Sequence, residues 1–450
     1  MKRRLNPTRI LLGGYIGIIL LGALLLLLPW SRNGDLSPLD ALFTSTSAVC
    51  VTGLIVKDTA TFYTIFGKAV IMGLIQVGGL SYMSFATLFL FLVGRKGSLV
   101  VRSTMAASYP DLPMGEVYRF ARRIVVMTLI AEALGFVILS FPFVSRYGFP
   151  GGLGHAAFQA VSAFCNSGFS TFSDSLTSWR GNILVNLTVL ALIVTGGLGF
   201  VALDEYYNRF IRRKRRKLTL HGRMVIAMTF GLITTGFVVF LAFEWTGAMA
   251  NFPVKDKILS ALFMAITPRT AGFNTLNYAS VSLFSILLTT VLMIIGASPG
   301  GTGGGMKTTT LAVVFLRLMA TLTGRHESSA LGYRIGPESI RKSYAVFVLA
   351  LFVVTGAILA LSLADSRGMI IRGFLPYLFE VASAFGTVGL SAGSFTVPNA
   401  SLSADLPVLG KCIIIITMLI GRIGVLTLFI TFVTPGRDLV RYVEGRVVIG

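Results

Sequence analysis

One short motif occurs four times along the chain at nearly regular intervals, and this repetition constrains the fold more than any other feature. The copies are 47–54, 162–169, 266–273 and 383–390. Their glycines, Gly53, Gly168, Gly272 and Gly389, lie 115, 104 and 117 residues apart in a chain of 450 residues. A phenylalanine precedes each glycine by nine or ten residues. We therefore expect four related structural units in tandem.

All four motifs lie in the same hydropathy context. Eight segments are long and apolar enough to cross the hydrocarbon, namely about 10–30, 64–93, 121–142, 183–203, 224–244, 281–297 with an irregular continuation to about 318, 344–363 and 411–433. A semi-apolar stretch too short to cross leads into each motif, at 38–49, 154–165, 256–267 and 373–385. Irregular backbone at membrane depth is tolerated only inside protein or beside water. Each unit is therefore predicted to be helix, half-helix, loop and helix.

The predicted fold is an all-α integral membrane protein, in which four tandem helix–pore-loop–helix repeats with eight spans surround one fourfold pseudo-symmetric pore, as in a potassium channel. The units are 1–96, 97–217, 218–342 and 343–436, followed by a C-terminal tail at 437–450. Only 13% of the residues are charged, against about 25% in soluble domains. The composition thus agrees with a protein embedded in a lipid bilayer.

The net charge of +21 is carried by short basic clusters between the apolar segments. All of these clusters fall on one side of the predicted spans, which is the cytoplasmic side by the positive-inside rule. We therefore expect a multi-pass protein of the cell membrane with both termini in the cytoplasm and with half-helices that enter from outside. The distribution favours topology signals over a nucleic-acid partner, although the clusters could also form a docking surface for another protein.

The motifs fit the chemistry of cation selection. A dehydrated cation needs rings of oxygen ligands, which backbone carbonyls supply. Aiming successive carbonyls to one side requires backbone angles that glycine adopts without steric cost. A half-helix that ends at the loop directs its partially negative C-terminus toward the ion. The alternative is that the glycines only permit close helix packing, but packing glycines are expected within spans rather than after half-helices.

On these motifs the chain resembles the membrane subunit of Ktr-type potassium uptake systems, in the superfamily that includes Trk and HKT proteins. The resemblance covers essentially the whole chain. It implies a potassium filter lined by backbone carbonyls of four loops: Cys50, Val51, Thr52 and Gly53; Cys165, Asn166, Ser167 and Gly168; Arg269, Thr270, Ala271 and Gly272; Gly386, Thr387, Val388 and Gly389. Serine in place of the first filter glycine is associated with sodium transport in plant relatives, so four glycines imply selectivity for potassium.

The resemblance also implies the partners. A cytosolic nucleotide-binding regulatory ring of the RCK type (KtrA/KtrC-like) is expected to control the membrane subunit. The chain has no nucleotide site of its own, so nucleotide control needs that ring. The C-terminal ending resembles that of Ktr subunits, where it takes part in the contact between two protomers, and a homodimer is therefore expected.

Arg269 lies inside the third motif, where a charge on the pore axis would repel potassium. Its side chain is therefore predicted to point behind the loop. A buried arginine there needs a partner, and Glu380 in the fourth half-helix is the candidate carboxylate.

A glycine-rich stretch interrupts the sixth span. Pro299 and its neighbouring glycines must break the helix there. The stretch is not a P-loop, since Met306 separates the last glycine from Lys307. The resemblance implies an intramembrane gating loop below the filter; an ordinary cytoplasmic glycine loop is the alternative. The predicted gate residues are Gly296, Ser298, Pro299, Gly300, Gly301, Thr302, Gly303, Gly304, Gly305, Lys307 and Arg422.

Arg422 is the gate residue that lies outside this stretch, within the eighth span. An arginine inside a transmembrane helix is costly and usually faces a cavity or a partner. The family has an arginine at this position that projects toward the pore. Arg422 is therefore expected to add a positive barrier to the path and to contact the loop; a buried structural ion pair is the alternative.

The sequence as a whole predicts a homodimeric, channel-like potassium uptake protein in which potassium is the transported ion. A sodium- or proton-coupled secondary transporter is the alternative, but such folds more often use inverted repeats. An enzyme would need clustered catalytic His, Asp, Glu or Cys side chains. Such groups are scarce at the predicted membrane depth, so no enzymatic activity is expected.

Overall fold

The computed structural model describes residues 7–80, 117–211, 213 and 217–432, and it is almost entirely helical. The main helices are α1 (Pro7–Leu27), α2 (Pro38–Val49), α3 (Thr59–Phe62), α4 (Ile65–Gly79), α7 (Val117–Tyr147), α8 (Gly151–Cys165), α9 (Ile183–Gly197), α10 (Phe200–Tyr206), α11 (Leu220–Glu244), α12 (Val254–Ile266), α13 (Leu283–Ile295), α14 (Thr308–Leu322), α15 (Pro337–Ala364), α16 (Ser366–Arg372), α17 (Phe374–Gly386), α18 (Val408–Ile423) and α19 (Val425–Phe432). Strands β1 (Ser329–Ala330) and β2 (Tyr333–Arg334) form a small hairpin. The predicted tail at 437–450 lies outside the described residues.

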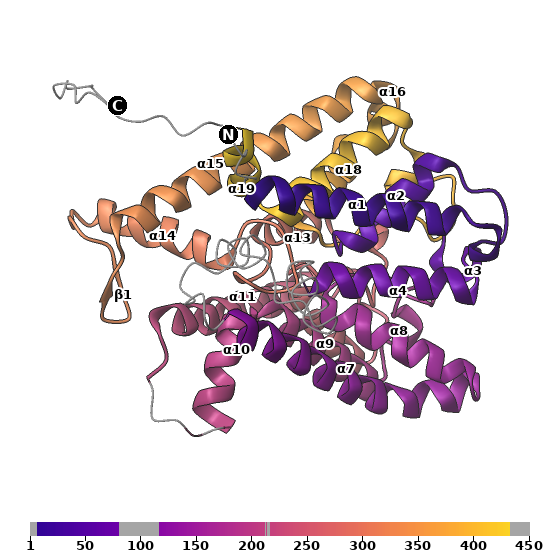
Figure 1. Cartoon of the computed structure of the whole chain (residues 1–450), viewed down its shortest axis with the longest axis horizontal. Coiled ribbons are helices and arrows are strands. Elements are labelled where there is room, and N and C mark those ends of the chain that lie inside the picture. The colour runs from indigo at the N-terminus through magenta and orange to yellow at the C-terminus, as the bar shows by residue number, and fades with distance from the viewer. Residues whose placement is uncertain (1–6, 81–116, 212, 214–216, 433–450) are drawn as a thin grey trace, which may run out of the picture.

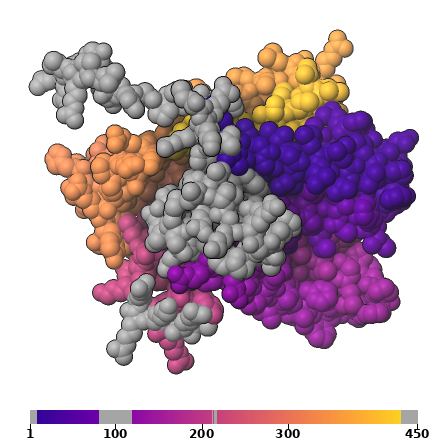
Figure 2. Space-filling view, in the orientation of Figure 1, coloured from indigo at the N-terminus to yellow at the C-terminus, as the bar shows by residue number. Residues whose placement is uncertain are grey.

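The four quarters of the chain follow one another around the molecule. Figure 1 shows α1, α2 and α4 beside α7, α8 and α9, and the colour then passes through α11 and α14 to α15 and α18. The last quarter returns to the first, since α18 packs on α2 and α19 on α1. The space-filling view shows the first two quarters in direct contact (Figure 2). The four quarters of the chain therefore form a closed ring, in which the last quarter contacts the first.

Four helices are long and apolar enough to cross a membrane among the described residues: Arg9–Leu27, Arg119–Tyr147, Leu220–Glu244 and Pro337–Ala364. They correspond to the first predicted span of each unit. The helices at the second spans have 15 residues in α9, 13 in α13 and 16 in α18, while α4 has 15 described residues and the part of its predicted span at 81–93 lies outside the described residues. The length criterion therefore supports four spans, or up to six if each of two bent helix pairs counts as one.

Two of the predicted second spans are not continuous helices. The span predicted at 183–203 is not one straight helix, because Ile183–Gly197 and Phe200–Phe210 meet at an angle of 104°. Gly199 occupies the bend with φ +90°, and a Cβ there would overlap the Pro299 carbonyl oxygen. The span predicted at 411–433 is interrupted at Gly424, where φ is +92°. Hydropathy does not distinguish a straight apolar helix from one that turns.

The half-helices agree closely with the sequence prediction. Helices α2, α8, α12 and α17 begin and end within three residues of the predicted stretches. Local chemistry sets the start of α2, because the Ser37 hydroxyl accepts a hydrogen bond from the Asp40 amide at 3.0 Å and Pro38 occupies the first turn. Their C-terminal halves are buried in the centre of the molecule. The fold therefore directs four helix C-termini to one place.

Candidate functional site

The four half-helices end in loops with the same backbone geometry. The residue two positions before each motif glycine is left-handed, with φ of 57° at Val51, 60° at Asn166, 72° at Thr270 and 50° at Thr387. The glycines themselves have φ of 92°, 72°, 77° and 94° in chain order. A non-glycine residue at positive φ is uncommon, so four at the same position of four motifs define a repeated structure. We name these segments the motif loops.

The four glycines form a closed cycle. A Cβ added to any of them would meet the next motif loop: Gly53 against the Ser167 carbonyl oxygen, Gly168 against Gly272 Cα at 2.9 Å and the Ala271 carbonyl oxygen at 3.0 Å, Gly272 against the Val388 carbonyl oxygen, and Gly389 against the Thr52 carbonyl oxygen. Each of these four carbonyls belongs to the residue that precedes a motif glycine. Glycine is thus required both by φ and by the approach of the neighbouring backbone.

Serine hydroxyls support two of the loops from behind. Ser47 accepts a hydrogen bond from the Gly53 amide at 3.0 Å, and Ser383 accepts one from the Gly389 amide at 3.0 Å. In the second unit Ser162 and Ser167 are hydrogen bonded to each other at 2.6 Å. Sequence reasoning did not assign a role to these serines. The signal was present, because three motifs begin with a serine six positions before the glycine.

Glycines of the second helices hold these helices against the half-helices. A Cβ on Gly78 would overlap the Val49 carbonyl oxygen, and one on Gly421 would overlap that of Phe385. Gly196 stands in the same relation to Phe164. These glycines therefore serve close packing, as small residues do between membrane helices.

Arg269 is directed away from the cycle of glycines, as predicted, but not toward a carboxylate. Its Nη2 donates to the Thr229 hydroxyl of α11 at 3.1 Å. Glu380 instead accepts hydrogen bonds from Ser391 and Ser403. Within the described part of the chain no ion pair joins Arg269 to Glu380, so that predicted pairing is wrong. The backbone of each half-helix fixes where these side chains lie, and the sequence alone does not reveal it.

A cavity of about 440 Å³ adjoins the cycle of glycines. All four motif glycines contribute to its lining, together with Asp58 and Asp174. None of the described residues that line it is basic, although the chain carries a net charge of +21. A concave surface with one sign of charge concentrates ions of the opposite sign. The mouth of the motif loops therefore favours cations.

The glycine-rich stretch 296–307 separates α13 from α14, as the sequence predicted. It is largely buried, with Ser298 and Thr302 fully inaccessible. Backbone hydrogen bonds attach it to two other units, since the Thr302 amide donates to the Gly196 carbonyl at 3.2 Å and the Gly305 amide to the Gly421 carbonyl at 3.2 Å. We name residues 296–307 the glycine loop. Its burial distinguishes it from an ordinary exposed connection.

The glycine loop also touches a motif loop directly. The Gly304 amide donates to the Thr387 hydroxyl at 2.9 Å. Lys307 folds back over the loop, where its Nζ donates to the Gly303 carbonyl at 2.7 Å and the Gly304 carbonyl at 3.3 Å. The other predicted gate residues, from Gly296 to Gly305, lie along the same buried segment. A change in the loop would thus reach the fourth motif loop without an intermediate element.

Arg422 connects three units. Its guanidinium donates to the carbonyl of Thr302 in the glycine loop and to the carbonyl of Gly78 in α4. Both partners are backbone oxygens, so these contacts anchor the guanidinium to carbonyls and are not an ion pair. The expected contact between Arg422 and the glycine loop is therefore present.

Comparisons with known proteins agree with this geometry. Residues 18–442 match the TrkH family, described as "Cation transport protein". The chain is 38% identical over 449 residues to the Ktr system potassium uptake protein B of Bacillus subtilis (strain 168), with 99% of this chain and 97% of the relative covered. It is 34% identical to the potassium/sodium uptake protein NtpJ of Enterococcus hirae, with 100% and 98% covered.

A solved structure has the same fold. The crystal structure of the potassium transporter TrkH from Vibrio parahaemolyticus superimposes with a TM-score of 0.73 at 20% identity, covering 96% of this chain and 86% of that one. The family match spans most of the chain, and two curated relatives exceed 30% identity over nearly their full length. This multi-pass membrane protein therefore belongs to the TrkH family of cation transport proteins.

Proposed function

We propose that the chain carries potassium into the cell through the cycle of four motif loops. The observation that carries the proposal is the closed cycle itself, in which four positive-φ glycines pack against carbonyls of Thr52, Ser167, Ala271 and Val388. Rings of backbone carbonyls replace the water shell of a cation. The relatives named for potassium uptake support this choice of ion.

In this proposal the four units are 1–96, 97–217, 218–342 and 343–436, and each contributes two spans and one filter loop. The packing of Gly78, Gly196 and Gly421 against the half-helices supports this arrangement, because it places the second helices beside the filter loops. The filter ligands are the carbonyls of 50–53, 165–168, 269–272 and 386–389. Inward movement needs no ATP, since a membrane potential of 100 mV supplies about 2.3 kcal/mol per charge.

We further propose that the glycine loop is the gate and that Arg422 fixes its closed position. The contact between Gly304 and Thr387 supports a loop that occludes the path next to the filter. A positive guanidinium beside this path would add an electrostatic barrier to a cation. Release of the loop then requires breaking the hydrogen bonds of Arg422 and Lys307.

A homodimer and a cytosolic nucleotide-binding ring complete the proposed system, with the termini and basic clusters on the cytoplasmic side. The relative named as part of a "Ktr system" supports a multi-component assembly. A ring that docks on the basic face would reach the glycine loop through α14, which begins directly after it.

Uptake by liposomes that contain the purified protein tests the proposal. We expect potassium and rubidium to enter in preference to sodium, driven by an imposed potential alone. Selective uptake only in the presence of a sodium or proton gradient would instead establish a coupled transporter. The relative named for potassium/sodium uptake is the reason to test this alternative. Sodium entry equal to potassium entry would refute a selective filter.

A further inference from the structure

A buried carboxylate lies behind the fourth motif loop. Glu380 of α17 is fully inaccessible. Its Oε2 accepts a hydrogen bond from the Ser391 hydroxyl at 2.7 Å, while its Oε1 accepts from the amide and the hydroxyl of Ser403 at 2.9 and 2.6 Å. Ser391 follows the motif glycine Gly389 by two residues. The carboxylate therefore binds the segment that leaves the motif loop.

Ser403, one of the two partners of Glu380, belongs to a segment that joins two motif loops. We name residues 401–403 the strap. The Leu402 amide donates to the Ser391 hydroxyl at 2.9 Å, next to the fourth motif loop. Ser401 pairs with Ile55 of the first unit, through its amide at 2.9 Å and its hydroxyl at 2.9 Å. Ile55 follows Gly53 by two residues, so the strap ties equivalent positions of loops one and four.

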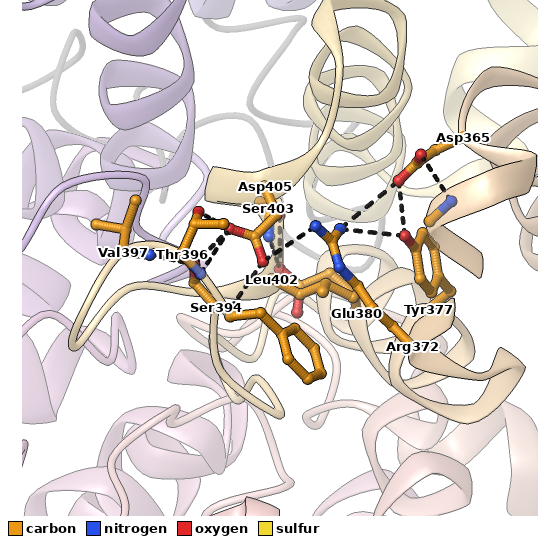
Figure 3. A network of polar contacts seen from close by, with 12 residues as sticks. Asp365, Arg372, Tyr377, Glu380, Ser394, Thr396, Val397, Leu402, Ser403 and Asp405 are labelled. Carbon is orange, nitrogen blue, oxygen red and sulfur yellow. Dashed lines mark hydrogen bonds and ion pairs between the residues drawn. The ribbon is translucent and has the colours of Figure 1, made fainter. Parts of the chain in front are cut away.

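A charged network follows the strap directly in sequence. Asp405 accepts a hydrogen bond from the Ser394 hydroxyl at 2.5 Å and from the Phe395 amide at 2.7 Å. Arg372 lies between Asp405 and Asp365, with 3.7 Å to each carboxylate. Figure 3 shows Glu380, Ser403 and this network side by side. Glu380 thus binds the strap itself, while Asp405, two residues after it, binds the segment 394–395.

The other three units lack this carboxylate. The positions equivalent to Glu380, nine residues before the motif glycine, hold Thr44, Gln159 and Phe263. Thr44 is hydrogen bonded to Tyr63 at 3.1 Å. Gln159 is fully buried, and the described structure offers its amide no partner. A carboxylate at this position of the half-helix is therefore a property of the fourth unit, whereas the second unit has a different one, Glu132 of α7, which accepts from the Cys165 thiol at 3.8 Å.

The hydrogen-bond pattern requires an acceptor at both ends of residue 380. The Ser391 hydroxyl already accepts from the amides of Gly393 and Leu402, so its one proton is donated to Glu380. On the other side, the Ser403 amide can only donate. A glutamine has one acceptor and one donor end, so either orientation places an NH₂ against a donor or a filled oxygen. The isosteric change Glu380→Gln thus breaks the anchor without leaving a cavity.

We infer that Glu380 is a specificity-determining positioning residue, which holds the strap and thereby the spacing of motif loops one and four against the conducted ion. The inference rests on the proposed potassium function. A carbonyl ring discriminates between potassium and sodium only while its oxygens keep their number and spacing. Release of the strap lets loops one and four approach the smaller ion.

The test compares Glu380→Gln with Glu244→Gln in liposomes. Glu244, at the end of α11, is an equally inaccessible carboxylate, and its hydrogen-bond partners, Ser282 and the Ala248 amide, belong to no motif loop and not to the strap. Potassium, rubidium and sodium uptake are measured for both variants, with thermal melting of each purified protein. We expect the potassium-to-sodium ratio to fall about tenfold in Glu380→Gln, equivalent to about 1.4 kcal/mol, and to remain unchanged in Glu244→Gln.

A folded Glu380→Gln protein with the wild-type ion ratio would overturn the inference, and so would an equal fall in both variants. If Glu380→Gln does not fold, Ser391→Ala removes the same anchor from the loop side and must lower the ratio. A wild-type protein without selective uptake would refute the proposed function itself. The two failures are therefore distinguishable.

Discussion

Two glycines with similar positive φ angles distinguish the cost of backbone strain from the cost of a steric conflict beside the filter. Gly53 has φ of +92°, and Gly332, in the turn between β1 and β2, has φ of +83°. A Cβ on Gly53 would overlap the Ser167 carbonyl oxygen and lie 3.1 Å from Gly168 Cα, whereas one on Gly332 meets nothing within 4 Å. Alanine therefore imposes a similar strain at both positions but a steric conflict only at Gly53.

The magnitudes follow from these contacts. Holding an alanine at this positive φ costs about 1–3 kcal/mol at either site. The overlap at Gly53 adds about 1–3 kcal/mol, the usual cost of overpacking. The sum at Gly53, about 2–6 kcal/mol, lies near or below the lower end of the roughly 5–15 kcal/mol that stabilises a typical domain. Both variants should therefore fold, with Gly53→Ala melting at a lower temperature than Gly332→Ala.

The functional effects should differ more than the stabilities. In Gly53→Ala the Ser167 carbonyl must move, so we expect potassium uptake by liposomes to fall by at least tenfold or to lose its preference over sodium. Gly332→Ala, in the β1–β2 turn and not among the residues that line the cavity, should retain the wild-type rate and selectivity. Equal rates and selectivities in the two folded variants would refute the assignment of Gly53 to the ion path.

Three further outcomes can be checked on the purified protein. Gly421→Ala should lower the stability by about 1–3 kcal/mol, because its Cβ would overlap the Phe385 carbonyl oxygen. Gly356→Ala, in open space within α15, should raise the stability by up to about 1 kcal/mol. A higher melting temperature for Gly421→Ala than for Gly356→Ala would contradict the packing. Burial alone would raise the pKa of Asp405, but its hydrogen bonds and Arg372 lower the pKa below the ordinary value of an aspartate. The ionised carboxylate therefore stabilises the fold at neutral pH, and this stability should be lost as the pH falls through the lowered pKa. The difference in melting temperature between pH 5 and pH 3 should be smaller in Asp405→Asn than in the wild-type protein. Lys307→Met frees the two carbonyls that its ammonium group holds, so uptake without any partner protein should rise; an unchanged rate would exclude Lys307 from the gate.

The sequence was sufficient for features that depend on local composition. Half-helix stretches of about twelve residues were too short to span, and their observed bounds agree within three residues. Pro299 and adjacent glycines predicted a helix break, and α13 indeed ends at Ile295. Repetition of the motif predicted equivalent loops, and their shared left-handed residue confirms that equivalence.

Features that depend on distances between units could not be predicted. Nothing near Gly199 in the sequence indicates that the glycine loop, a hundred residues later, occupies the space into which α9 would continue. The expected partnership of Arg269 and Glu380 failed for the same reason. The prediction paired Arg269 with Glu380 only because their charges are opposite. In the structure Arg269 is hydrogen bonded to the Thr229 hydroxyl and Glu380 to the Ser391 hydroxyl.

The four units are most alike where they meet and least alike behind that point. Every motif loop keeps the same two positive-φ positions. At the second of them only glycine fits, because the approach of the neighbouring loop admits no side chain. The supporting groups are free to differ: a glycine loop follows only the third unit, and Glu380 and Arg422 occur only in the fourth. A symmetric cycle of motif loops can bind one ion equally from all four units. Opening and closing the ion path instead need contacts that only some of the units make. The asymmetric groups gather at the junctions of units three, four and one, and that is where we expect motion to begin.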